Sequence, residues 1–485
     1  MKAIKTTVKG VLINISNEYL DEISELMTVF SSAKRFAFKR LNEGKIKKGE
    51  LEKLIAHKYG INIRQSKDAA QAARQMIASQ KSLIKDYYEN YARKVKAIEK
   101  QLEKAKSQKK THALTKKLEK RKKKQEFYKN HIDNDTIPKI IFGGRNNFIR
   151  RCKGLISNEE WKSLRDNNYY SRGDKTKKGN PNLRIVITNN MAFLEISTLE
   201  KNENNKAVKI RVPLYLPQKL SKKTGKINGR NYRQIISDYL LTGEAYQVEL
   251  IKKDDKIYCH ITIDESKIRE YKEEFNLFNG VIGVDTNPDG LALTRLDKDG
   301  NYKWSVYLKE SELLYARTDR RENLCGELIR NVVNIAKSEQ CAIAFEDLKF
   351  KNDKDVKSKF ARTKHQFIYG KLLSMLDTRA IRENIQRFKV KPQFTSKIGL
   401  YKYCHQYGLD VHNGAALVIA RRAFGFNEKI PKVLKTKLLE KSELEKFNKQ
   451  VNWKKWSIIN QRIKKKGGEY PSLWLKHRKL LLNIS

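Results

Sequence analysis

Long apolar runs are missing from this sequence, and none approaches the roughly 20 residues that a helix needs to cross a bilayer. Residues 1–16 lack the apolar stretch and the small-residue cleavage site of a secretory signal. The five cysteines are scattered, and none belongs to a Cys-x-x-Cys pair. These absences argue against a disulfide framework and against a zinc site built from thiolates. We therefore expect a cytoplasmic protein with reduced thiols and no membrane segment.

Acidic residues are also in short supply. The chain has 55 Asp and Glu against 103 Lys and Arg, which gives a formal net charge of +48 over 485 residues. Such an excess repels itself unless a polyanion neutralises it. Nucleic acid is the polyanion that fits best, because lysine and arginine displace the counterions of its phosphates. The alternative is a basic protein whose charged faces are simply solvated.

The spacing of apolar residues changes along the chain and predicts an α+β multidomain protein. Residues 1–16 alternate as a strand does, and residues 17–150 contain helical repeats of three or four positions. A second β-region contains the hairpin turns Asn189-Asn190 and Asp254-Asp255. We predict that 1–16 and 151–278 form one β-barrel wedge domain, into which the helical domain is inserted.

The most basic segment is residues 91–130, which hold 16 Lys or Arg and four Glu. A narrow apolar seam through Val95, Ile98 and Leu102 indicates helix. We favour a helical hairpin laid along a phosphate backbone, and the alternative is a charged surface coiled coil. Five other side chains are candidates for contact with nucleic acid: Lys67, Gln71, Arg145, Arg421 and Arg422.

The last third of the chain reads as a mixed α/β domain over 279–430. Three strands in a meander precede an alternation of helix and strand, a layout typical of the ribonuclease H architecture. The remaining residues, 431–485, form a basic tail to which the sequence assigns no function.

Two carboxylates in this domain end apolar strands. Asp285 follows Val281–Val284, and Glu346 follows Ala342–Phe345. If the strands are neighbours, the carboxylates face each other at a sheet edge and favour a hard divalent cation. Two Mg²⁺ ions roughly 4 Å apart can then activate water and stabilise the leaving oxygen of a phosphodiester. Either residue taken singly is more often a turn residue or a cap.

Four segments carry a family resemblance: Gly283-Val284-Asp285, Ile343–Leu348, Pro392–Ser396 and Gly414-Ala415-Ala416. In order and spacing they resemble the RuvC motifs of TnpB, the transposon-encoded RNA-guided nuclease, and of compact type V CRISPR effectors. The helical block within a β-barrel wedge domain is similar to that family's N-terminal layout. The resemblance implies a double-stranded DNA endonuclease whose guide RNA supplies sequence recognition. It also implies that Asp285 and Glu346 are catalytic metal ligands.

Two features depart from the family pattern. The family's four-cysteine zinc knuckle is reduced to one cysteine, Cys404, in the segment 396–409, so we expect no zinc. The position of the third catalytic acid is held by His412, and Asp410 lies two residues earlier. His412 can ligate a metal or position water, whereas Asp410 suits Mg²⁺ better and is also a plausible helix cap. Both stay candidates for the third ligand.

The sequence therefore predicts an Mg²⁺-dependent, RNA-guided DNA endonuclease with guide RNA and double-stranded DNA as partners. The alternative within the family is an inactive guided DNA-binding protein that acts as a repressor. An unguided nucleic-acid-binding protein and a transposase are alternatives from other classes. The source of the guide, the flanking DNA motif and the oligomeric state are left open.

Overall fold

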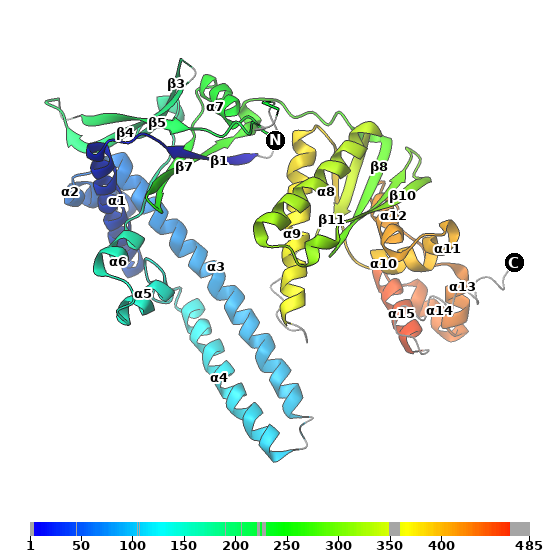
Figure 1. Cartoon of the computed structure of the whole chain (residues 1–485). Helices are drawn as coiled ribbons and strands as arrows, with labels where there is room; N and C mark the ends of the chain where they lie inside the picture. Colours follow the sequence, from blue (N-terminus) through cyan, green and yellow to red (C-terminus); the bar gives the residue numbers. More distant parts are fainter. Residues whose placement is uncertain are drawn as a thin grey trace. The chain divides into compact units, whose positions relative to one another are not determined.

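The computed structural model describes residues 4–44, 46–103, 105, 107–189, 191–204, 206–220, 224–225, 229–348 and 359–465. The chain divides into two compact units, Met1–Glu270 and Tyr271–Ser485 (Figure 1). Among the described helices, none combines the length and the apolar character that a membrane crossing requires.

One antiparallel sheet organises the first unit. Its strand order is β2 (Asn168–Ser171), β6 (Gln247–Lys253), β7 (Lys256–Asp264), β1 (Lys5–Leu12), β5 (Ala207–Tyr215), β4 (Met191–Lys201) and β3 (Leu183–Thr188). β1 pairs with both β7 and β5, so the helices that follow β1 in the chain are an insertion into the sheet. Both predicted hairpin turns are present, joining β3 to β4 and β6 to β7. The sheet is a curled half-barrel, so the predicted β-barrel domain is present in this open form, with β2 and β3 as the edge strands of the described sheet.

Seven α-helices are described in this unit: α1 (Asn17–Glu43), α2 (Lys48–Tyr59), α3 (Ile63–Leu102), α4 (Gln108–Asp133), α5 (Arg145–Cys152), α6 (Asn158–Arg165) and α7 (Tyr232–Leu241). Asn62 caps α3, since its side chain accepts the backbone N–H groups of Arg64 and Gln65. The Gln65 side chain accepts the Asn62 backbone N–H in return and completes a capping box. The helix start is therefore fixed by its own sequence.

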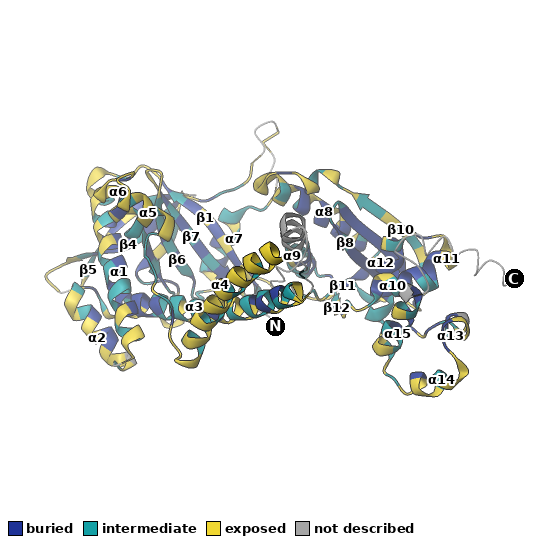
Figure 2. Cartoon of the chain, turned by 90° about the horizontal axis from the view of Figure 1, so that it is seen from below, coloured by how far each residue is buried: buried dark blue, intermediate teal, exposed yellow. Residues whose placement is uncertain are grey.

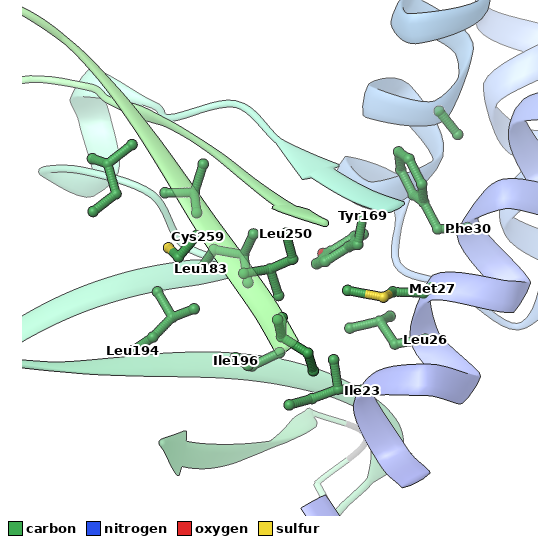
Figure 3. Close-up of a cluster of buried hydrophobic side chains, with 14 of the residues drawn as sticks. Ile23, Leu26, Met27, Phe30, Tyr169, Leu183, Leu194, Ile196, Leu250 and Cys259 are labelled. Atoms are coloured by element: carbon green, nitrogen blue, oxygen red, sulfur yellow. The ribbon is translucent and has the colours of Figure 1, made fainter. Parts of the chain in front are cut away.

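Helix α1 packs its apolar face on the half-barrel (Figure 3). Ile23, Met27 and Phe30 are fully buried there. The Phe30 ring meets the Tyr169 ring of β2 edge-on, with centroids 5.0 Å apart. The helical insertion is thus anchored in the core of the sheet that it interrupts.

Helices α3 and α4 form the basic hairpin that the sequence predicted, but its first arm starts earlier than expected. The helix that contains the start of the basic segment 91–130 begins at Ile63, so α3 is a single helix of 40 residues. Ile84, Val95 and Ile98 are buried along α3, whereas α4 buries no residue (Figure 2). The second arm therefore presents most of its lysines to solvent.

A mixed sheet organises the second unit, in the order β10 (Tyr302–Lys309), β9 (Gly290–Leu296), β8 (Asn276–Asn287), β11 (Cys341–Glu346) and β12 (Arg387–Val390). β8, β11 and β12 run parallel to one another, whereas β9 runs antiparallel to both of its neighbours, β8 and β10. α8 (Thr318–Ser338) and α9 (Lys359–Arg382) share a core with Ile343 and Phe345. α12 (Val411–Ala423) shares a core with Ala342 and Ala344. Alternate residues of β11 thus face opposite layers, as its continuous apolar run predicted.

The segment that carried the reduced zinc knuckle is helical. It contains α10 (Thr395–Ile398), a π-helical turn (Gly399–Tyr403) and α11 (Cys404–Tyr407). Cys404 is buried, and its thiol donates to the backbone carbonyl of Asp410 at 3.1 Å. This contact joins the segment directly to the start of α12.

The predicted C-terminal tail is a structured part of the second unit over the residues that the structure describes. It forms α13 (Lys432–Leu438), α14 (Lys441–Asn448) and α15 (Asn452–Lys465). Trp456, Ile459 and Ile463 are buried in the same core as α12. The composition of this segment suggested a tail, because its many basic residues hide the few apolar residues that pack into the core. Residues 466–485 of the predicted tail lie outside the described residues.

Candidate active site

Two carboxylates lie side by side near the carboxyl-terminal ends of two neighbouring strands of the mixed sheet. The register pairs Val284 of β8 with Phe345 of β11, so Asp285 and Glu346 are the next residues on neighbouring parallel strands. Asp285 is only 8 % exposed, and Glu346 is partly buried. The two residues expected to act together are therefore brought side by side, each at the end of an apolar strand.

Burial raises the pKa of both carboxylates. Burial, together with the charge of Asp285, raises the pKa of Glu346 to about 7. Burial also raises the pKa of Asp285, against the opposing effect of the neighbouring His412. Among the described residues, neither carboxylate has a lysine or arginine within ion-pair distance. The site is thus a pair of buried carboxylates without a lysine or arginine ion pair, and the cationic groups that act on it are His412 at Asp285 and Arg422, which lies beyond ion-pair distance of Glu346.

Neutral donors orient both carboxylates. The Thr395 hydroxyl donates to Glu346 Oε1 at 2.6 Å, and the Asn287 side-chain amide donates to Asp285 Oδ2 at 3.2 Å. Thr395 belongs to the Pro392–Ser396 motif, to which the sequence had assigned no role beyond the resemblance. These contacts fix the direction of the carboxylates and leave part of their oxygens free for a ligand.

The two candidates for the third ligand are held differently. His412 Nδ1 lies 3.4 Å from Asp285 Oδ2, and the His412 side chain is half exposed. Asp410 caps α12, since Oδ1 accepts the backbone N–H groups of His412 and Asn413 at 2.7 and 3.0 Å. Its Oδ2 accepts the side-chain amide of Asn413 at 2.5 Å. His412 therefore contacts the carboxylate pair, whereas the oxygens of Asp410 are occupied by the cap.

The donor set suits a hard divalent cation, although a complete shell is not assembled. Within the described part of the chain, no three His, Cys, Asp or Glu side chains are grouped as metal ligands. Asp285 and Glu346 nevertheless supply adjacent carboxylate oxygens, the type of ligand that Mg²⁺ prefers. Because no lysine or arginine forms an ion pair with either carboxylate, a divalent cation would balance their charge. His412 is the nearest further donor, and water or phosphate oxygens would have to complete the coordination.

Three residues near the pair were not identified from the sequence. Asp289, in the turn between β8 and β9, accepts the Tyr307 hydroxyl at 2.6 Å and acts electrostatically on His412. Burial and the charges of Asp285 and Asp289 raise the pKa of Tyr369 to about 12. The sequence offered one signal, the Asn287-Pro288-Asp289-Gly290 turn directly after the strand that carries Asp285.

Helix α12 reaches the sheet closely because small residues line the contact. A Cβ on Gly283 would overlap the Ala416 carbonyl oxygen and lie 2.7 Å from the Ala420 nitrogen. A Cβ on Gly399 would likewise lie 2.4 Å from the Gly414 carbonyl carbon. This close packing sets the distance between α12 and the sheet, and it therefore places His412 against Asp285.

The two arginines proposed for DNA contact are engaged within the protein. The Arg421 guanidinium donates to Glu428 at 2.5 Å and lies over the Phe426 ring. Arg422 donates to the backbone carbonyls of Lys391 and Gln393, the latter at 2.7 Å, and acts electrostatically on Glu346. The sequence gave no sign of these partners. In the structure, both arginines make contacts within the protein itself.

The other three candidates lie in the first unit. Lys67 is exposed and lines a cavity of about 300 Å³ together with Arg64 and Arg172. Gln71 follows one turn later on α3 and is half-buried, and Arg145 is exposed at the start of α5. A role for them in nucleic-acid binding stays a prediction.

Comparison with known proteins adds a family for the N-terminal part of the chain. No curated protein matches the sequence. Three solved structures are similar to parts of it. The RuvC structure from Thermus thermophilus has 14% identity and a TM-score of 0.21, and covers 29% of this chain and 90% of its own. A Cas12f1–sgRNA–target DNA complex has 12% identity and a TM-score of 0.23, and covers 87% of this chain and 100% of its own. A Cas12i1 R-loop complex after target DNA cleavage has 9% identity and a TM-score of 0.20, and covers 86% of this chain and 54% of its own.

A family model, described as the SSO2105 N-terminal domain, matches residues 5–273, which is more than half of the chain. The matched range spans the half-barrel, the helical insertion and the connection to the second unit. This chain therefore belongs to the SSO2105 N-terminal domain family.

Proposed function

We propose that this protein is a divalent-metal-dependent DNA endonuclease guided by RNA. The observation that carries the proposal is the buried pair Asp285 and Glu346, which lie near the carboxyl ends of two neighbouring parallel strands and, among the described residues, have no lysine or arginine within ion-pair distance. Structural carboxylates of this kind are normally paired, because an isolated buried charge is costly. Two neighbouring carboxylates without a lysine or arginine ion pair, in a chain of net charge +48, are suited to holding cations against a phosphodiester.

Asp285 and Glu346 would hold the metal, with His412 as the third protein donor. When bound, Mg²⁺ would supply Lewis-acid stabilisation of the phosphate and an activated water. Thr395 keeps Glu346 in place by its hydrogen bond, and Asn287 does the same for Asp285. His412 is half exposed beside Asp285, so, if it does not ligate the metal, it can instead position the attacking water or accept its proton.

The first unit supplies the surface that binds nucleic acid. Helix α4 buries no residue and presents its lysines along one exposed arm. Such a surface binds phosphates without regard to sequence, so recognition of a target has to come from another source. The motif resemblance assigns this to a guide RNA, whose pairing with the target strand replaces direct reading of bases by the protein.

Sequencing of the RNA that co-purifies with the full chain tests whether the protein carries a guide RNA. We expect one uniform scaffold with a variable segment, and random cellular RNA would contradict the proposal. Cleavage is then tested on a matching DNA target with Mg²⁺. Asp285→Asn and Glu346→Gln should abolish cutting and leave DNA binding intact. Asp299→Asn is the control, because Asp299 is an exposed carboxylate of the same unit in the turn between β9 and β10.

One observation favours a second candidate, a guided DNA-binding repressor without cleavage. His412 cannot supply a negative charge where the family resemblance implies an acid, and Asp410 is occupied by the cap of α12. With two carboxylates, the site binds cations less tightly than with three. Target binding in the presence of the co-purified RNA, with no cutting in Mg²⁺ or Mn²⁺, would identify this second function.

A further inference from the structure

A cavity of about 610 Å³ lies wholly within the second unit and is lined in part by residues of β12, the strand that pairs with β11. Its walls come from the end of β12, the segment after α12 and the start of α15. This volume falls within the range of roughly 300–1,000 Å³ that is usual for small-ligand sites. The proposed function makes no use of it.

Aromatic rings stand at the cavity without being buried. Trp453 is 58 % exposed and Phe426 is 37 % exposed, although both line the cavity. Trp456, one turn further along α15, is buried instead, and its indole N–H donates to the Glu428 carbonyl at 2.9 Å. The packing of α15 thus uses Trp456 and leaves the Trp453 ring available to a ligand.

The same cavity is lined by positive charge. Lys391 is exposed and, among the described residues, has no acidic partner within ion-pair distance. Lys389 is also exposed and pairs with Asp377 at 2.7 Å. The one carboxylate in the lining, Glu428, is buried and neutralised by Lys402 and Arg421. A ligand here therefore meets flat apolar rings together with cations.

Strand pairing connects the lining of the cavity to the carboxylate pair. Val390, which lines the cavity, is the strand partner of Glu346. Phe394, also in the lining, has a φ of 62°, a left-handed conformation that is costly for an aromatic residue. It directly precedes Thr395, which holds Glu346. Strain of this kind is commonly kept at functional positions because the surroundings over-determine it.

We infer that this cavity receives a nucleobase of single-stranded DNA beside the phosphate to be cut. The base would stack on Trp453, with Phe426 as a further wall of the cavity, and the adjoining phosphates would contact Lys391. Aromatic rings interleaved with cations are the usual means of holding unpaired strands without regard to sequence. The location beside the scissile phosphate rests on the proposed nuclease function, whereas base binding in the cavity does not.

The test uses the full chain in EDTA, so that it is independent of cleavage. A fluorescent deoxythymidylate of six nucleotides is titrated at several salt concentrations. Trp453→Ala should weaken binding roughly 5- to 150-fold, the loss expected for one stacked base, and Trp453→Phe should restore most of it. Lys391→Ala should reduce the salt slope by about 0.7, as expected for one phosphate contact on a single strand. Phe278→Ala is the matched control, because Phe278 is 85 % exposed in the same unit and lies outside the cavity lining.

Photocrosslinking then locates the base. The same oligonucleotide carrying 5-iododeoxyuridine should give adducts on Trp453 or Phe426, and Trp453→Ala should remove the first of these. Adducts confined to other residues, with unchanged affinity in Trp453→Ala, overturn the inference even if the wild type cuts DNA. Equal or tighter binding of the matching oligouridylate, with the same adducts, assigns the cavity to RNA and also overturns it. Adducts at Trp453 in a protein that never cuts would retain the base site and reject the nuclease function.

Discussion

Substitution of Asp285 by asparagine should stabilise the metal-free protein. The change keeps the size of the side chain and removes one of two neighbouring buried charges. Burial and the charge of Asp285 raise the pKa of Glu346 from 4.5 to about 7. A shift of this size corresponds to a cost of about 3 kcal/mol once Glu346 is ionised in the folded state. The cost arises first from burial, so the substitution should recover only a part, on the order of 1 kcal/mol.

The sign of the pH dependence follows from the raised pKa. Between pH 4.5 and about 7 the folded protein holds the Glu346 proton more tightly than the unfolded chain does. Stability contributed by this group therefore falls as pH rises through that window, and the whole cost is present above pH 7. Asp285→Asn should flatten this fall, because the Asp285 charge no longer opposes ionisation of Glu346.

Thermal unfolding in EDTA at pH 5 and pH 8 measures the effect. At pH 8 we expect a melting temperature about 2–4 °C higher than that of the wild type, given the size of the second unit. At pH 5 the difference should shrink, because Glu346 is then protonated in both proteins. Added Mg²⁺ should raise the melting temperature of the wild type at pH 8 and leave Asp285→Asn nearly unchanged. A variant that melts below the wild type at pH 8 would refute the reasoning, since the pair would then be stabilising as it stands.

Two further predictions concern packing and charge. Gly283→Ala should destabilise the second unit by about 1–3 kcal/mol in denaturant titrations, because its Cβ would overlap the Ala416 carbonyl. The control Gly326→Ala, on α8, meets only Met375 at 3.5 Å, so it should be neutral or stabilising. Replacing the exposed Lys116, Lys120 and Lys123 of α4 by glutamine should lower the salt slope of double-stranded DNA binding by about 0.9 for each phosphate that is no longer neutralised. Unfolding should be unaffected by this triple change, and an unchanged salt slope would show that α4 lies away from the DNA.

The sequence by itself determined the elements that depend on local patterns. Apolar runs located β8 and β11 and therefore the carboxylates that follow them, because strands buried on both faces need continuous apolar residues. The dipeptides Asn189-Asn190 and Asp254-Asp255 located two hairpins, since both turns require residues that tolerate positive φ, as observed at Asn189, Asp254 and Asp255.

Features that arise from packing between distant segments were decided only in three dimensions. His412 contacts Asp285 because Gly283 allows α12 to approach the sheet, and the order of residues along the chain carries no information about that approach. Trp453 and Trp456 look equivalent in sequence, yet one is buried and the other lines a cavity, because only one side of α15 meets the core. Periodicity reports which residues share a face, whereas burial, pKa and cavity shape depend on what lies opposite that face.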